Sequence, residues 1–77
     1  MRKIEILGKG CPKCKELEAR AKKAVEELGI EAEVKKVNDV NVFARYGVFM
    51  TPGLVIDGEV KSAGRVPSLE EIKEWLK

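Results

Sequence analysis

The stretch GKGCPKCKELEAR (residues 8–20) contains both cysteines of this 77-residue chain, separated by two residues. Before it, residues 3–7 (KIEIL) alternate between charged and apolar side chains, which is typical of a strand. Gly8-Lys9-Gly10 then allows a tight turn. Pro12 follows at the first position of a helix, which tolerates its missing N–H. The helix is predicted from an apolar stripe at spacings of three and four, ending before Gly29: Cys14, Leu17, Ala21, Val25 and Leu28.

The middle of the chain predicts a second strand and a short helix. Residues 30–37 alternate between apolar and charged side chains, as in a strand with one exposed face. Asn38 or Asp39 can cap the N terminus of a helix that Gly47 closes. All the aromatic side chains are expected in the core: Phe43, Tyr46, Phe49 and Trp75.

The last third of the chain predicts a hairpin and a final helix. Residues 54–56 and 60–62 flank an Asp-Gly dipeptide at 57–58, which suits a tight turn between antiparallel strands. Ser68, with Glu71 three residues later, forms a capping box for the helix that follows. A right-handed first βαβ unit makes its strands parallel, so the sheet is mixed, with helices on both faces. We therefore expect one three-layer α/β domain.

Composition excludes several classes of function. The chain is 44% hydrophobic and 36% charged, which indicates a globular domain. Its net charge is only +2, with signs that alternate and form no basic block, so neither nucleic acid nor a membrane surface is expected as a partner. No apolar run suits a signal peptide or membrane span, which predicts a cytoplasmic protein. The absence of His and Gln, with abundant Lys and Glu, is typical of thermophile proteins.

Cys11 is expected to be the reactive thiol of the pair. It precedes the helix, where unpaired backbone N–H groups and the helix dipole stabilise a thiolate and lower the pKa below the free value of about 8.5. Cys14, one turn further into the helix, is expected to be more buried and to act as the resolving thiol. Pro12 stiffens the turn between them and removes one N–H donor. Three lysines add positive charge: Lys9, Lys13 and Lys15.

A soft metal ion is the alternative occupant of a CxxC pair. Two thiolates from each of two molecules could complete a site for Cu(I) or Zn, as in heavy-metal-associated domains. Those domains end in a strand, however, whereas SLEEIKEWLK (residues 68–77) has the pattern of a capped helix. A closed zinc site within one chain would need further ligands, and the chain has no His and only two Cys. Thiol–disulfide chemistry is therefore favoured over metal transfer.

The CPKC motif at a strand-to-helix turn, with Thr51-Pro52 before a hairpin and a last helix, resembles the thioredoxin and glutaredoxin superfamily. The stretches GKGCPKC, TPGLVIDG and SAGRVPSLEEI resemble its small archaeal and bacterial redox-active disulfide proteins most closely, over essentially the whole chain. The resemblance implies a minimal thioredoxin-like fold, βαβαββα, with strand order 2-1-3-4. It also implies a thiol–disulfide oxidoreductase with Cys11 as nucleophile and Cys14 as resolving cysteine. No cofactor is expected, because the two sulfurs carry the electrons.

The same resemblance assigns residues around the cysteines. It implies that Pro52 is cis and lies beside the pair, and that Thr51 offers backbone groups to an extended substrate, although Pro-Gly could also be an ordinary turn. Lys9 fits a contact with a glutathione carboxylate. Gly64 and Arg65 precede the last helix, whose N terminus could hold an anion, although Ser68 there could be only its cap. Lys13 either tunes the site or is simply solvated.

Glu5 lies six residues before Cys11, the offset at which thioredoxins place a buried acid that moves protons for the second cysteine. It is either such a proton shuttle or a partly solvated strand residue paired with Lys3 or Lys36. The expected partners are disulfide-containing proteins and a reductant, either a thioredoxin-reductase-like enzyme or a low-molecular-weight thiol. The chain is expected to act as a monomer.

Overall fold

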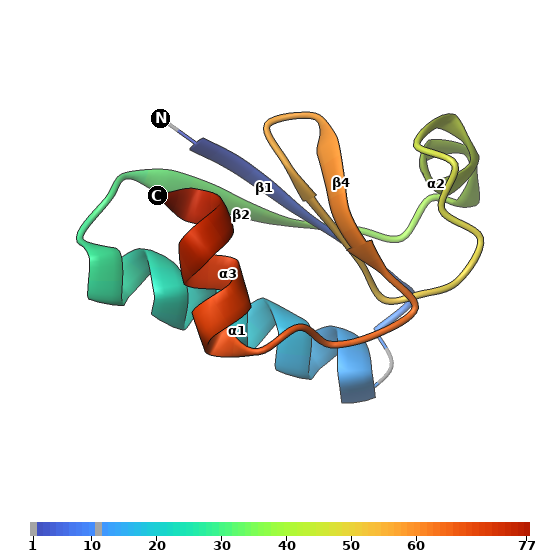
Figure 1. Ribbon diagram of the computed structural model, residues 1–77. Helices are drawn as coiled ribbons and strands as arrows, with labels where there is room; N and C mark the ends of the chain where they lie inside the picture. Colours follow the sequence, from blue (N-terminus) through green and yellow to red (C-terminus); the bar gives the residue numbers. More distant parts are fainter. Residues whose placement is uncertain (1, 11) are drawn as a thin grey trace.

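The computed structural model describes residues 2–10 and 12–77 (Figure 1). Along the chain the elements are β1 (Arg2–Leu7), α1 (Pro12–Leu28), β2 (Ala32–Val37), α2 (Val40–Arg45), β3 (Gly53–Ile56), β4 (Glu59–Ala63) and α3 (Leu69–Leu76). The sheet has the order β2-β1-β3-β4. β1 and β2 are parallel, whereas β3 is antiparallel to both β1 and β4. The predicted mixed sheet and its strand order are confirmed.

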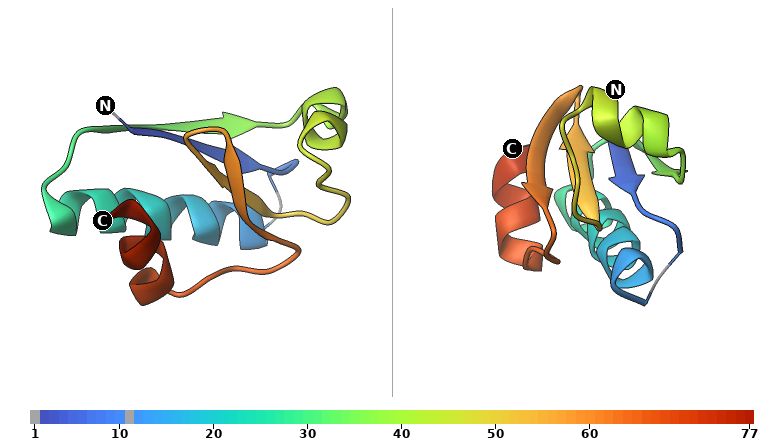
Figure 2. Two further views of the ribbon diagram at one scale, coloured as in Figure 1. Left: turned by 45° about the horizontal axis from the view of Figure 1, so that its top comes forward. Right: turned by 90° about the vertical axis from the view of Figure 1, so that its right-hand side faces the viewer.

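Helices α1 and α3 cover one face of the sheet (Figure 2). Their core forms because every second side chain of β1 and β3 points to this face and meets the apolar stripe of α1. It contains Ile4, Ile6, Leu54, Ile56, Leu17, Ala21, Ala24, Ile72 and Leu76, each no more than 2% exposed. The α1 stripe differs from the prediction toward its C-terminal end, since Ala24 is fully buried whereas Val25 and Leu28 are only partly buried.

The short helix α2 covers only one end of the opposite face. Phe43 and Val48 pack there on Leu7 and Val55, while charged side chains of β1 and β2 line the rest of this face. Helices on both faces are therefore confirmed. The predicted burial of Phe49 is wrong, because Val48 takes the inward position of the loop and leaves Phe49 88% exposed.

The turn and cap residues behave largely as predicted. Asp57 and Gly58 have φ values of 52° and 83°, the left-handed pair that a tight two-residue hairpin turn requires. The Asp39 carboxylate caps α2 by accepting the N–H of Asn41. Ser68 caps α3 through the N–H of Glu71, at 3.2 Å. The capping box is incomplete in one respect, because the Glu71 carboxylate pairs with Arg65 at 2.8 Å.

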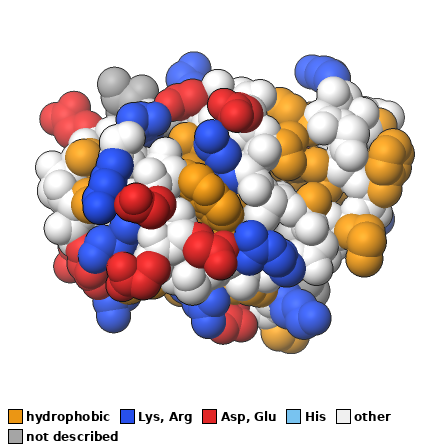
Figure 3. Space-filling model, in the orientation of Figure 1, with side chains coloured by type: hydrophobic (Ala, Val, Ile, Leu, Met, Phe, Trp, Pro, Cys, Tyr) orange, Lys and Arg blue, Asp and Glu red, His pale blue; other side chains and the backbone are white. Residues whose placement is uncertain are grey.

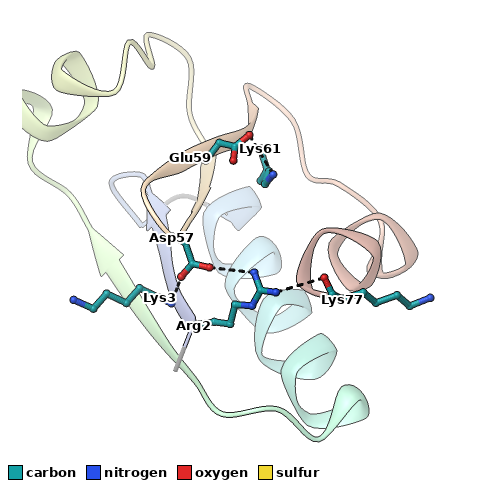
Figure 4. Close-up of polar contacts among 6 residues, drawn as sticks. All are labelled: Arg2, Lys3, Asp57, Glu59, Lys61 and Lys77. Atoms are coloured by element: carbon teal, nitrogen blue, oxygen red, sulfur yellow. Dashed lines mark hydrogen bonds and ion pairs between the residues drawn. The ribbon is translucent and has the colours of Figure 1, made fainter.

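The chain ends and the β3–β4 turn meet at the end of the sheet away from α2 (Figures 1 and 4). The Arg2 guanidinium donates to the Asp57 carboxylate at 3.1 Å and to the Lys77 carbonyl at 3.4 Å. Asp57 also accepts the backbone N–H of Lys3 at 2.9 Å. These hydrogen bonds hold the pKa of Asp57 below its usual value of 3.8, and the bond from the Lys3 N–H has the largest effect. Across residues 2–10 and 12–77, no helix is both long and apolar enough to span a membrane.

Candidate functional site

The cysteine pair lies where β1 gives way to α1. Cys11 falls outside the described residues, so its predicted role as nucleophile stays a prediction. Pro12 is the first residue of α1, as predicted, and both Pro12 and Lys13 are exposed. Cys14 is only 5% exposed, which confirms its predicted burial. Cys14 is therefore the first residue of the buried face of α1 and lies within the first turn of the helix.

The Cys14 thiol lies against the backbone of Gly8. A Cβ atom built on Gly8 would collide with Sγ of Cys14 and would come within 3.1 Å of its Cβ. Gly8 is itself buried, and its N–H donates to the carbonyl of Val37 at 2.9 Å. The sequence predicted a flexible turn here and missed this contact. The available signal was a glycine directly after a buried strand, six residues before a cysteine on a helix core face.

Pro52 reaches the same place from β3. The Thr51–Pro52 peptide bond is cis, as predicted, with Pro52 buried and Thr51 exposed. Leu7 pairs with Gly53 at the end of the antiparallel β1–β3 ladder, so Gly8 and Pro52 each lie one residue beyond this pair, at the same end of the two strands. The Pro52 carbonyl in turn accepts the N–H of Gly64 at 2.9 Å. Cys14, Gly8, Pro52 and Gly64 are therefore brought together from four parts of the chain.

Apolar side chains are exposed beside Pro52. Phe49 and Met50 are 88% and 68% exposed. Met50 also lies close to Gly64, since a Cβ atom built on Gly64 would be 3.1 Å from Cβ of Met50. Val40, at the start of α2, is 53% exposed. Figure 3 shows hydrophobic side chains gathered at the end of the molecule that carries α2 and the loop after it. Exposed apolar groups that gather beside a reactive site are typical of a binding surface.

Positive charge borders the other side of the cysteine loop. A hollow of about 350 Å³ is lined by Gly8, Lys9, Gly10, Lys36 and Asn38. Lys36 is also 3.9 Å from the Glu18 carboxylate, and this long ion pair contributes little because the Lys36 side chain is exposed. Lys9 lines this hollow with Lys36, and its predicted contact with a glutathione carboxylate stays a prediction. The sequence did not associate Lys36 with this hollow, because β2 brings it there from another part of the chain.

Glu5 accepts a hydrogen bond from the Tyr46 hydroxyl at 3.0 Å. The hydrogen bond that is found is therefore not with a lysine but with Tyr46, the C-cap residue of α2. This bond, followed by burial, raises the pKa of Tyr46 above 10.0. Glu5 alternates with Ile4 and Ile6, which face α1, so its carboxylate lies on the α2 face of the sheet. Its role as a proton shuttle for Cys14 stays a prediction.

Two further predictions concern ligands. Arg65 is held by Glu71 at the start of α3, so an anion binding there would compete with this carboxylate. Among the residues that the structure describes, no group of three or more His, Cys, Asp or Glu side chains could hold a metal ion. A site shared between two molecules through Cys11 is not tested by that observation.

Comparison with known proteins agrees with the geometry. Residues 2–77 match the family model described as "Thioredoxin domain". A protein named "Thioredoxin" from Methanocaldococcus jannaschii is 55% identical over 74 residues, which cover 96% of this chain and 85% of the relative. Another "Thioredoxin", from Methanothermobacter thermautotrophicus, is 49% identical over 76 residues, 99% of both chains.

Proposed function

This chain belongs to the thioredoxin family of thiol–disulfide oxidoreductases, and we propose that its Cys11–Cys14 pair exchanges electrons with protein and small-molecule disulfides. The observation that carries the proposal is the place of the Cys14 thiol. It is buried in the first turn of α1 against Gly8, at the end of the β1–β3 ladder from which Pro52 extends. A buried second thiol suits the resolving role. It cannot attack a substrate disulfide in solution, but it can attack a mixed disulfide that has already formed on Cys11.

In the proposed reaction the Cys11 thiolate attacks one sulfur of a substrate disulfide and releases the other sulfur as a thiolate. Cys14 loses its proton and attacks the Cys11 sulfur in the mixed disulfide. The second substrate sulfur leaves as a thiolate, and Cys11 and Cys14 form a disulfide. Two electrons pass to the substrate, and no dissociable cofactor takes part. The N terminus of α1 and the lysines near it favour the thiolate of Cys11.

Protein disulfides are the proposed main substrates. Phe49 and Met50 would contact apolar side chains of the substrate, and the exposed Thr51 would offer its backbone to an extended segment. Lys9 would attract acidic groups next to the disulfide. We place the reaction in the cytoplasm, with a monomeric chain. Its disulfide would be reduced there by a thioredoxin-reductase-like enzyme or a low-molecular-weight thiol.

The test is a redox titration of the protein in buffers of defined dithiothreitol ratio, followed by alkylation and mass measurement. A reversible two-electron transition that is lost in Cys11→Ser is expected. Cys14→Ser serves as the matched control, because it should still form a mixed disulfide through Cys11 but should not resolve it. Failure of the wild-type protein to form an intramolecular disulfide at any accessible potential would overturn the proposal. Tight binding of Cu(I) or Zn with slow exchange would then identify the metal-transfer alternative.

A further inference from the structure

We infer that Gly8 is a positioning residue for Cys14, and that its missing side chain is what allows Cys14 to resolve the mixed disulfide. The inference rests on the proposed function, since it concerns the second half of that reaction. It begins from the contact between the two residues, in which a Cβ on Gly8 would overlap Sγ of Cys14.

The backbone is held in place on both sides of this contact. Gly8 follows Leu7, which is fully buried and paired with both Val37 and Gly53, and its own N–H is bonded to the Val37 carbonyl. Cys14 lies three residues before the fully buried Leu17 on the inner face of α1. A side chain at residue 8 would therefore displace the Cys14 sulfur by rotation about χ1, because both backbones are held and overpacking forces side chains out of their preferred rotamers.

Backbone conformation does not explain the glycine. Gly10, two residues later, has φ of 80°, a value that disfavours other residues, but Gly8 does not have a positive φ. Alanine is thus compatible with the backbone at residue 8 and excluded only by the contact with Cys14. The two glycines of the loop therefore have different roles. Gly10 permits the backbone conformation of the turn, whereas Gly8 leaves space for the Cys14 sulfur.

The position of the sulfur decides the rate of the second step. In that step a bond forms between Sγ of Cys14 and Sγ of Cys11, while the bond from Cys11 to the substrate sulfur breaks and the substrate leaves as a thiolate. Misplacement of a reacting atom by about 1 Å can slow such a step about 100-fold. The first step uses Cys11 alone, so Gly8 should not affect it directly.

The two steps can be followed separately with an aromatic disulfide, 5,5′-dithiobis(2-nitrobenzoate), mixed with equimolar reduced protein. The first thionitrobenzoate released reports attack by Cys11, and the second reports resolution by Cys14. In Gly8→Ala we expect the first rate to stay within about twofold of wild type and the second to fall at least about tenfold. Alkylation should trap the aromatic mixed disulfide on Cys11.

The control is Ala24→Val, which overpacks the same core roughly 15 Å further along α1 and should leave both rates near wild type. An unchanged second rate in Gly8→Ala, or an equal loss in both rates, would overturn the inference. If wild type itself released no second thionitrobenzoate, the proposed function would fail instead.

A stability cycle tests the contact independently of the reaction. Under reducing conditions, Gly8→Ala should lower the urea midpoint in the wild-type background and should lower it much less in Cys14→Ala, where the sulfur is gone. If Gly8→Ala does not fold, the double variant Gly8→Ala/Cys14→Ala should fold. An equal loss in both backgrounds, or failure of both proteins to fold, would mean that another contact requires the glycine and would refute the inference.

Discussion

The two ends of one sheet are built in opposite ways. At the end with the chain termini, Arg2 joins Asp57 of the hairpin turn to Lys77, and Asp57 also accepts the backbone N–H of Lys3 (Figure 4). At the other end, Phe49 and Met50 are exposed to solvent beside loops rich in glycine. Strands β1 and β3 run through both ends, so the difference does not come from the sheet. It comes from the side chains placed where the strands stop.

The comparison indicates that one end of the sheet stabilises the fold and the other end is available for binding. Polar cross-links at the terminal end hold the first strand, the hairpin and the last helix together, whereas the cysteine end leaves apolar surface uncovered. Exposed apolar groups contribute little to folding and are instead available to a partner. Changes at the cysteine end should therefore alter exchange more than stability, and changes at the terminal end the reverse.

The largest effect is expected from Phe49→Ser/Met50→Ser. Its kcat/KM for reducing a protein disulfide should fall about 30-fold, since two apolar contacts are lost and each contributes roughly 1 kcal/mol to substrate binding. Unfolding in urea should change little, because both side chains are exposed in the free protein. A small aromatic disulfide provides the internal control, because it is too small to reach this surface. Equal losses with both substrates would contradict the comparison.

The next effect is a gain of stability in the interior of the sheet, away from the exposed side chains of either end. Ser62 of β4 is 7% exposed, and its hydroxyl has no hydrogen-bond partner among the described residues. Burial of an unpaired hydroxyl is unfavourable, so Ser62→Ala should raise the free energy of unfolding by about 1 kcal/mol. Ser68→Ala is the matched control, since its hydroxyl caps α3 and its loss should lower stability by a similar amount. Urea denaturation should give opposite signs, and a loss in both variants would refute the prediction.

A somewhat smaller effect is expected where α2 meets the open face of the sheet. Tyr46→Phe removes the hydrogen bond to Glu5 and should lower the free energy of unfolding by about 0.5–1 kcal/mol. Glu5→Gln and the double variant complete a cycle that measures the coupling between the two side chains. No coupling would show that the bond does not contribute to stability. The same Glu5→Gln protein tests proton transfer, because a shift in the pH profile of the second exchange step would assign Glu5 to the reaction.

The sequence predicted most of the fold because its signals are local. Pro12, the Asp57-Gly58 turn and the Ser68 cap each act within a few residues, and the α1 stripe repeats often enough to define its buried face. The burial of Cys14 followed from that stripe.

What the sequence did not predict depends on contacts between distant segments. Phe49 lies in a loop without a periodic pattern, so nothing in the sequence distinguished it from the buried Val48 beside it. The Glu5–Tyr46 bond joins residues 41 positions apart, which no spacing rule links. Gly8 was interpreted as a turn residue because glycine favours turns, and only the packing of α1 on β1 shows its contact with a thiol.

The smallest effect is expected at the terminal end, in the pH dependence of stability. The fold lowers the pKa of Asp57, first because its carboxylate accepts the Lys3 N–H and then because Arg2 lies beside it. The ionised carboxylate therefore stabilises the fold above its unfolded pKa, and this contribution is lost as pH falls through the lower folded pKa. Asp57→Asn, which tolerates the left-handed turn, should have a lower Tm than wild type at pH 7, with the difference closing toward about pH 2.

Arg2→Ala is the control for this last change, because it keeps the Lys3 bond and should therefore keep most of the pH dependence. Neither variant should alter the exchange rates, since both residues lie at the end of the sheet away from the start of α1. Thermal unfolding between pH 2 and 7, together with release of thionitrobenzoate at neutral pH, measures both properties on the same samples. A constant Tm difference across this pH range, or slower exchange in Asp57→Asn, would mean that the two ends of the sheet are not separate in their roles.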